Sequence, residues 1–175
     1  MGLDVRLVMT MSEHFLCHSG MTFIADNTYP IENSASYSKI KYERVKSVEF
    51  IRGKGNELLF VEAKKSFPTP NNAENKKRFR KKINDICEKF IHSLHLYSAI
   101  KVGVVTETLP DTFKPASSVY LQFVLVIKDF EHESCEDIQT ALTYQLYESI
   151  PISTIWKPAI YVINDAQAKK FNLIT

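Results

Sequence analysis

Two adjacent segments of this 175-residue chain are apolar on both of their faces. The segments cover residues 44–51 and 58–64, and the turn between them contains Gly55 and Asn56. Glycine at the first central position favours a two-residue hairpin turn, so the segments are predicted to pair as antiparallel strands. A strand pair without a solvated face belongs inside a sheet that is covered on both sides. The chain is therefore predicted to form layers around this hairpin.

The turn also sets the register of the two strands. With Lys54 opposite Glu57, counting along the strands places Glu49 opposite Glu62. Side chains in such positions lie ~4.5–5.5 Å apart, and at an effective dielectric of ~20 two carboxylates at this separation repel each other by about 3 kcal/mol. Solvent screening, a shared proton or a bound cation can offset this repulsion. Lys64, two residues after Glu62, shares its face, which favours a sheltered site for a divalent cation.

Alternation divides the other residues of the hairpin between its two faces. The face that carries the two glutamates and Lys64 also carries Ile51, Leu58 and Phe60, while the opposite face carries Val48, Phe50, Leu59, Val61 and Ala63.

The remaining hydrophobic patterns predict an α/β (α+β) fold with a central mixed sheet flanked by helices. A long amphipathic helix is predicted over residues 72–100, and further helices over 135–149, with Ser134 and Asp137 spaced as a capping box, and over 165–171. Strands are predicted over 21–25, 119–127 and 159–163, whereas residues 1–18 fit either a helix or a strand. Without a repeat or an internal linker, residues 1–175 are expected to form a single domain.

Composition narrows the class of protein. No apolar run approaches the ~20 residues of a membrane span, and the first residues lack the features of a secretory signal, so a cytoplasmic protein is expected. Three widely spaced cysteines argue against a disulfide framework. A formal charge of +2 is too small to diagnose nucleic-acid binding. The chain also lacks a phosphate-cradling glycine loop, a nucleophile elbow and a dinucleotide fingerprint.

Glu49, the hairpin and the triplet Glu62-Ala63-Lys64 resemble the signature of the PD-(D/E)XK nuclease-like superfamily. The resemblance extends over residues 45–130 and implies a restriction-endonuclease-like core. It implies that Glu49, Glu62 and the backbone carbonyl of Ala63 bind Mg²⁺, with Mn²⁺ as a substitute, and that Lys64 positions or activates the attacking water. Position 49 is Glu instead of the more usual Asp, and no proline precedes it.

Members of this superfamily often contribute another carboxylate from a helix ahead of the sheet. Glu32, which follows Pro30 at the start of a possible short helix, is the first candidate for that ligand, and Glu13 is the second. His14, Cys17 and His18 have a spacing that suits a metal on a helix, but no second ligand pair accompanies them.

Basic residues crowd the start of the predicted long helix and could bind the phosphates of a nucleic acid, expected to be DNA. These residues are Lys76, Lys77, Arg78, Arg80, Lys81 and Lys82. A solvated helix face is the alternative explanation for the run. A homodimer is a further possibility, because one core of this size offers little surface for gripping a duplex.

Three functions remain open at this point. The first is Mg²⁺-dependent hydrolysis of phosphodiester bonds in nucleic acid. The second is a catalytically inactive nuclease-like module that binds nucleic acid or protein. The third, an acid/base enzyme in which Glu49 and Glu62 share a proton, is disfavoured because Lys64 would lower the pKa of both carboxyls. Tyr120, Trp156 and Tyr161 are assigned to packing or to an interface.

Overall fold

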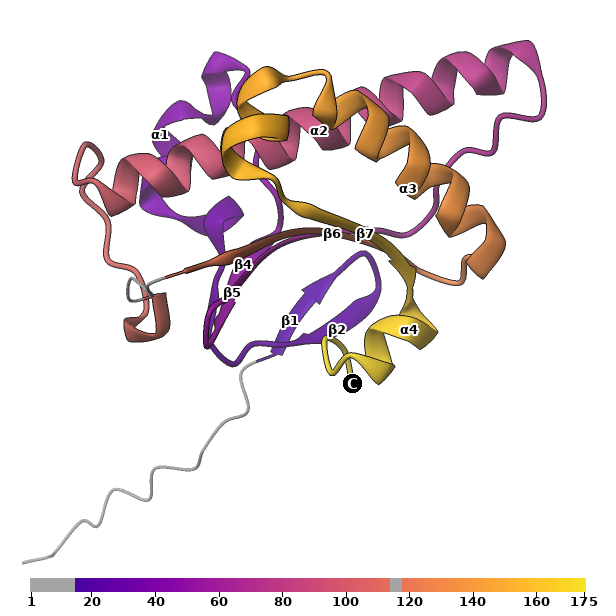
Figure 1. Ribbon diagram of the computed structural model, residues 1–175. Coiled ribbons are helices and arrows are strands. Elements are labelled where there is room, and N and C mark those ends of the chain that lie inside the picture. The colour runs from indigo at the N-terminus through magenta and orange to yellow at the C-terminus, as the bar shows by residue number, and fades with distance from the viewer. Residues whose placement is uncertain (1–14, 114–117) are drawn as a thin grey trace, which may run out of the picture.

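The computed structural model describes residues 15–113 and 118–175 (Figure 1). Seven strands and four α-helices alternate along this part of the chain, together with short 3-10 turns and one π-helical turn. The strands are β1 (Phe15–His18), β2 (Met21–Ile24), β3 (Thr28–Tyr29), β4 (Phe50–Lys54), β5 (Glu57–Lys64), β6 (Tyr120–Ile127) and β7 (Ala159–Asn164). The α-helices are α1 (Ala35–Ile40), α2 (Ala73–Lys101), α3 (His132–Tyr147) and α4 (Asp165–Lys170).

The central sheet has five strands in the order β3-β4-β5-β6-β7, and β1 and β2 form a separate antiparallel hairpin. Strands β3, β4 and β5 pair antiparallel, whereas β5, β6 and β7 pair parallel. The parallel pairs require crossovers, which α2 and α3 supply. This arrangement confirms the predicted mixed α/β fold.

The β4–β5 hairpin has the predicted register. Lys54 lies opposite Glu57, and the ladder continues to Phe50 opposite Val61. Gly55 takes a positive φ of 61°, a conformation that glycine adopts without steric cost. The sequence was therefore sufficient to fix which residues of these two strands face each other.

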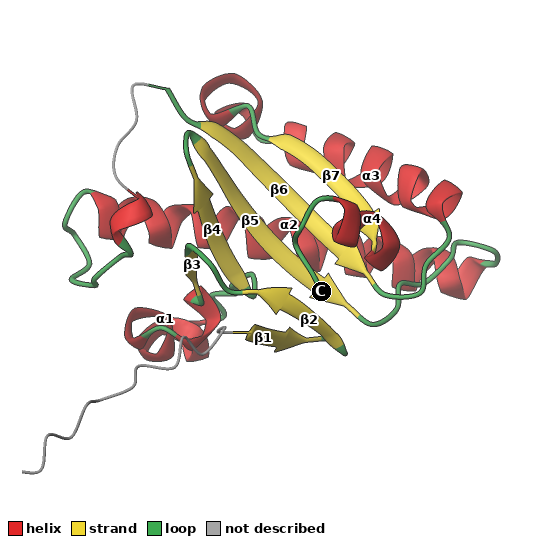
Figure 2. Ribbon diagram, turned by 90° about the horizontal axis from the view of Figure 1, so that it is seen from below, coloured by secondary structure: helices red, strands yellow, loops and turns green. Residues whose placement is uncertain are grey.

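Around the β4–β5 hairpin the sheet is packed on both faces, although the second face is covered only in part (Figures 1 and 2). Helices α1, α2 and α3 lie on one face, where Ile51 and Phe60 join the larger hydrophobic core. Within this core the ring of Phe90 from α2 stacks on Phe123 from β6 at a centroid distance of 4.6 Å. The helix thus packs directly on the middle of the sheet.

The second face carries a smaller core that involves the β1–β2 hairpin, α4 and the C-terminal residues. Phe50 and Val61 enter this core from the sheet, and Phe23 enters it from β2. Ile174 forms a bridge with Phe23, and the backbone N–H of Ile24 donates to the carbonyl of Leu173 at 3.0 Å. The last residues of the chain therefore hold the small hairpin in place.

Residues 44–48 do not form the predicted first part of β4. Arg44 has a left-handed conformation with φ of 61°, and the backbone after it is irregular until Phe50. Side chains of α2, instead of a neighbouring strand, accept the N–H groups of this segment. Val48 consequently packs in the larger core, although alternation assigned it to the other face with Phe50.

Helix ends were less predictable than helix cores. The long helix begins one residue later than predicted, with Asn72 as its cap, and α3 begins at His132 with no side-chain cap at Glu131. The predicted capping box at Ser134 is therefore wrong, because that residue lies inside the helix. A capping box does occur at α4, where Asn164 and Gln167 bond reciprocally.

Strand β7 forms one edge of the sheet, and a side chain occupies part of that edge. The N–H of Val162 donates to Oε1 of Gln139, which reaches over from α3, at 3.0 Å. A backbone donor that would otherwise face outward is therefore satisfied within the chain.

No helix within residues 15–113 and 118–175 is long and apolar enough to cross a membrane. The three cysteines are free, with Cys17 exposed and the other two buried. Burial raises the pKa of Cys87 to about 12 and that of Cys135 to about 11.

Replacement of Phe90 by alanine tests the packing of α2 on the sheet. Because Phe90 is fully buried and stacked on Phe123, we expect Phe90→Ala to lower the free energy of unfolding by about 3–5 kcal/mol, measured by urea denaturation. Tyr144→Ala, at an exposed position of α3, should change it by less than about 0.5 kcal/mol. A loss below about 1 kcal/mol for Phe90→Ala would contradict this account.

Candidate active site

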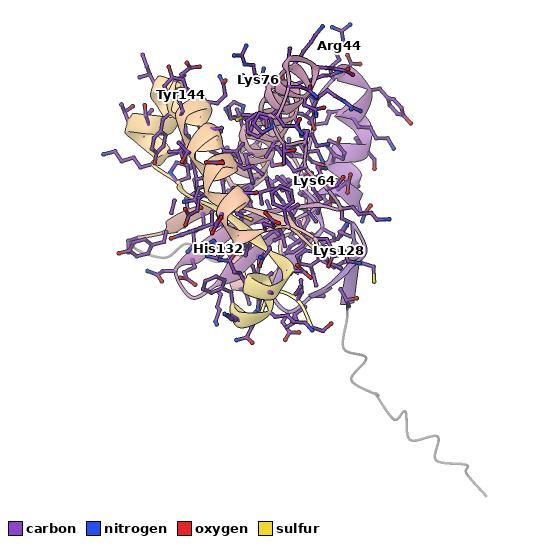
Figure 3. The ribbon with its side chains drawn as sticks, turned by 90° about the vertical axis from the view of Figure 1, so that its right-hand side faces the viewer. Arg44, Lys64, Lys76, Lys128, His132 and Tyr144 are labelled. Atoms are coloured by element: carbon purple, nitrogen blue, oxygen red, sulfur yellow. The ribbon has the colours of Figure 1, made fainter. Side chains whose placement is uncertain are left out.

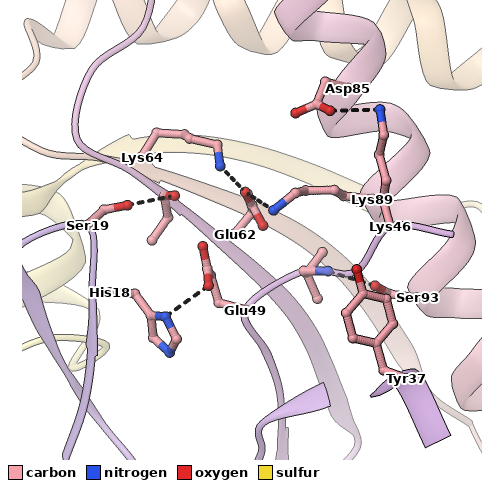
Figure 4. A network of polar contacts seen from close by, with 12 residues as sticks. His18, Ser19, Tyr37, Lys46, Glu49, Glu62, Lys64, Asp85, Lys89 and Ser93 are labelled. Atoms are coloured by element: carbon pink, nitrogen blue, oxygen red, sulfur yellow. Dashed lines mark hydrogen bonds and ion pairs between the residues drawn. The ribbon is translucent and has the colours of Figure 1, made fainter. Parts of the chain in front are cut away.

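The centre of the candidate site is Glu62, a fully buried carboxylate near the carboxyl end of β5 (Figure 4). Two ammonium groups contact the same oxygen of this carboxylate. Nζ of Lys64 lies 2.5 Å from Oε1, and Nζ of Lys89, which comes from α2, lies 2.8 Å from it. One lysine therefore belongs to the same strand and the other to the helix packed on it.

The second oxygen of Glu62, Oε2, is buried and has no hydrogen-bond partner among the described residues. A buried polar atom without a partner costs about 1–3 kcal/mol, and more when the group is charged. Burial raises the pKa of Glu62, and the charges of Lys89 and Lys64 oppose that rise. The site thus presents one satisfied and one unsatisfied carboxylate oxygen.

Glu49 stands next to Glu62, immediately before β4 begins (Figure 4). Its backbone N–H donates to the carbonyl of Val61 at 3.1 Å, which continues the hairpin pairing by one bond. Repulsion from Glu49 contributes to the raised pKa of Glu62. The two glutamates therefore approach each other as the register predicted, although Glu49 lies just outside the regular strand.

Glu49 belongs to a group of three side chains that could hold a metal ion. His18, Glu32 and Glu49 each offer a ligand atom within 4.8 Å of the others. Nδ1 of His18 lies 2.8 Å from Oε2 of Glu49. Glu32 lies in a 3-10 turn, Ile31–Asn33, which follows Pro30.

The environment of this group moves the pKa values of its two carboxyls apart. Burial raises the pKa of Glu32 to about 7, and the hydrogen bond that it makes to Glu49 adds to the rise. Burial acts in the same direction on Glu49, but hydrogen bonds from His18 and Glu32 lower its pKa to about 2. The hydrogen bond to Glu49 raises the pKa of His18. A cation that bound here would compete with these protons for the carboxylate oxygens.

The β1–β2 hairpin places His18 beside the sheet. Its two-residue turn consists of Ser19 and Gly20, both with positive φ (52° and 73°), as a type I′ turn requires. Oγ of Ser19 donates to the carbonyl of Ala63 at 3.0 Å. This carbonyl, a metal ligand according to the family resemblance, thus already accepts one hydrogen bond from the protein.

Helix α2 positions the segment that leads into Glu49. The N–H of Lys46 donates to Nδ1 of His92 at 3.1 Å, and the N–H of Val48 donates to Oγ of Ser93 at 2.8 Å. Lys89 and these two residues lie on adjacent turns of α2, so the same stretch of helix fixes both Glu49 and Glu62.

Sequence reasoning missed two members of the site, His18 as a partner of Glu49 and Lys89. The serine-glycine dipeptide after His18 is a turn signal that would have indicated a hairpin instead of a helical metal motif. Lys89 lies three residues after Ile86 and so flanks the apolar stripe of the helix. Cys17 is exposed and lies outside the His18 group, and Glu13 and His14 lie outside the described residues.

The basic residues at the start of α2 are exposed, and they lie apart from the carboxylates. They are Lys76, Lys77, Arg78, Arg80 and Lys81. The first buried residue of α2 is Ile83, and Figure 1 shows the first turns of the helix extending past the sheet. At 1.5 Å per residue, they lie about 12–20 Å along the helix from Lys89.

Lys82 links this run to the carboxylates. It is partly buried, and both burial and the charge of Lys64 lower its pKa. Figure 3 shows Lys76 near the top of the molecule and Lys64 below it, and Lys76 lies in the first turns of α2. Positive charge therefore continues from the outer turns of the helix to the buried site.

Compared with protein-family models, with curated proteins and with solved structures, the chain matches none of them.

Removal of Lys89 tests the ion pairs of Glu62. We expect Lys89→Met to lower the free energy of unfolding by about 2–4 kcal/mol, because it leaves a buried carboxylate with one ammonium instead of two. The double variant Glu62→Gln/Lys89→Met should recover at least half of this loss. Lys81→Met, on an exposed position of the same helix, serves as the control in the same urea titrations. Equal stability of Lys89→Met and wild type would contradict the assignment.

Proposed function

We propose that this protein is a metal-dependent nuclease related to the PD-(D/E)XK superfamily, and that it hydrolyses phosphodiester bonds in DNA at a site formed by Glu49, Glu62 and Lys64. The observation that carries the proposal is the unsatisfied oxygen of Glu62, which is buried beside Glu49. A carboxylate oxygen of this kind is a ligand that a hard divalent cation prefers.

The residues around this oxygen suit such a cation. Glu49 and Glu62 supply carboxylates from neighbouring segments, and Glu32 lies within ligand reach of Glu49. Mg²⁺ favours an all-oxygen ligand set, whereas Mn²⁺ accepts similar ligands. Nδ1 of His18 lies 2.8 Å from Oε2 of Glu49 and so would orient this ligand.

Each residue has a separate part in the proposed reaction. Lys64 and Lys89 fix Oε1 of Glu62, so that Oε2 is the oxygen left to bind a cation. Lys64 is less buried than Glu62 and is the ammonium that would position an attacking water. In this chemistry a bound divalent cation supplies charge neutralisation at the phosphate and a lower pKa for water.

The basic turns of α2 are proposed to bind the phosphates of the substrate. A strand of duplex DNA carries one phosphate about every 3.4 Å along the axis, so the 12–20 Å between these residues and Lys89 corresponds to roughly four to six phosphates. A nucleic acid that contacts both would pass Lys82 on its way to Glu62.

A second candidate function, the inactive nuclease-like module, is favoured by the charges of the site. The carboxylates already have partners within the chain: Oε1 of Glu62 contacts Lys64 and Lys89, and Glu49 contacts His18. Burial also raises the pKa of Glu32 to about 7. Groups of the protein itself thus compensate the acidic side chains, as in a structure that retains the fold for binding alone.

A cleavage assay distinguishes the two functions. Supercoiled plasmid and single-stranded oligonucleotides are incubated with the protein in Mg²⁺, in Mn²⁺ or in EDTA. We expect cleavage of DNA that requires the metal and that falls about 100-fold or more in Glu62→Gln and in Lys64→Ala, because both lose groups that act on the reacting phosphate. Glu133→Gln and Lys39→Ala, at exposed positions, should cleave at the wild-type rate.

The same samples are tested for DNA binding by electrophoretic mobility shift. Binding without cleavage in any metal would support the inactive module. An absence of both cleavage and binding would overturn both proposals, and cleavage that is equal in wild type and Glu62→Gln would place the active site elsewhere.

A further inference from the structure

The sheet face opposite α2 is only partly covered, and its bare part forms a pocket. Strands β1 and β2 lie across one end of this face, while the amino-terminal ends of β5, β6 and β7 have no helix or strand in front of them (Figure 2). A cavity of about 300 Å³ lies there, bounded on one side by the residues after α4. This volume is at the lower end of the range for small-molecule sites.

The pocket is separate from the candidate active site. Leu59 points into the pocket, and because Glu62 lies three residues farther along the same strand, its side chain points to the opposite face, toward Lys89 of α2. A ligand in the pocket would therefore not contact the carboxylates.

The floor of the pocket is apolar and one margin is aromatic. Leu59, Val124 and Ile163 come from three adjacent strands and form the floor. Tyr161 on β7 and Phe171 after α4 line the cavity and remain 44% and 65% exposed. Exposed aromatic rings beside an apolar floor provide a surface for a flat ring of a ligand.

The strand β4 supplies positive charge to the same cavity. Arg52 and Lys54 lie two residues apart and so share the pocket face. Nη1 of Arg52 donates to the carbonyl of Asn172 at 2.8 Å, which holds the guanidinium against the C-terminal segment. Its Nε is buried and has no hydrogen-bond partner among the described residues. This guanidinium therefore has a donor that the protein itself does not satisfy.

The single acidic residue that lines the pocket does not balance these charges. Glu57 stands beside Gln122, whose Nε2 lies 3.4 Å from Oε1 of the glutamate. Arg52 and Lys54 against Glu57 leave the pocket with one excess positive charge.

We propose that this pocket binds a small molecule that has a flat conjugated ring system and an anionic group. The ring would lie on the apolar floor beside Tyr161 and Phe171, and the anion would pair with Arg52 and Lys54. The combination of a guanidinium with an unsatisfied donor and an apolar floor favours this class over a neutral lipid and over free phosphate, because each of these matches only half of the pocket.

The probe for this test is 8-anilinonaphthalene-1-sulfonate, which combines fused rings with a sulfonate and fluoresces when bound. We expect the full chain to bind one equivalent saturably. Arg52→Gln should weaken binding at least 10-fold, Tyr161→Ala about 5-fold and Lys54→Gln about 3-fold. Tyr144→Ala, which removes an exposed tyrosine of α3 outside the pocket, should change the Kd by less than 2-fold.

Competition identifies which features of the probe matter. 2-Naphthoate should displace it, 2-naphthol should do so at least 10-fold less well, and phosphate should not displace it at the same concentration. Circular dichroism checks that each variant is folded, and if Arg52→Gln is not, Lys54→Gln and Tyr161→Ala decide the result.

Several outcomes would overturn the proposal: no saturable binding below 1 mM probe (about −4.1 kcal/mol), an equal loss in Tyr144→Ala, or no loss in the pocket variants. Glu62→Gln should leave probe binding unchanged, so the pocket and the nuclease proposal can fail independently.

Discussion

The ion pairs of Glu62 are the constraint on which the rest of this structure depends. A carboxylate with no exposed surface lies in a strand whose other side chains are largely apolar, and it must be compensated by groups within reach. Lys64 comes from the same strand, but Lys89 comes from α2. The charge of Glu62 is therefore paired by both lysines only when α2 lies where Lys89 can reach it. Stacking of Phe90 on Phe123, one residue along the helix, agrees with that position. Electrostatics and packing therefore favour the same docking of α2.

This docking also determines the surroundings of Glu49. The turn of α2 after Lys89 presents His92 and Ser93, which accept the N–H groups of an irregular segment and deliver Glu49 to the start of β4. From the other side of the sheet the β1–β2 hairpin brings His18 to the same carboxylate. The site is thus assembled from both layers around one strand hairpin. The ion pairs with His18, Lys64 and Lys89 offset the repulsion between the two neighbouring glutamates.

Local sequence patterns were enough to predict the β4–β5 hairpin. They did not predict which side chains from other elements contact its glutamates. The turn at Gly55 fixed the register of β4 and β5, and the spacing of apolar residues located α2 to within a residue at either end. The first part of the predicted strand, before Phe50, was wrong because Val48 is buried in the core beside α2 and not in a strand ladder, and an apolar residue pattern alone cannot distinguish the two. The contacts of His18 and Lys89 depend on how elements far apart in the sequence pack together. Residue spacing along the chain does not predict that packing. Glu32 was accessible to reasoning because Pro30 marked a helical start.

The side chain of Gln139 on the β7 edge has a consequence for how copies of this chain can meet. A five-stranded sheet with a bare edge would recruit another strand through its free N–H and carbonyl groups. Here the amide oxygen of Gln139 already accepts the N–H of Val162. An incoming strand would have to displace that side chain before it could form a continuous ladder. Growth of the sheet across molecules is disfavoured at this border. A symmetric pair of subunits, if one forms, would join through side chains on another surface.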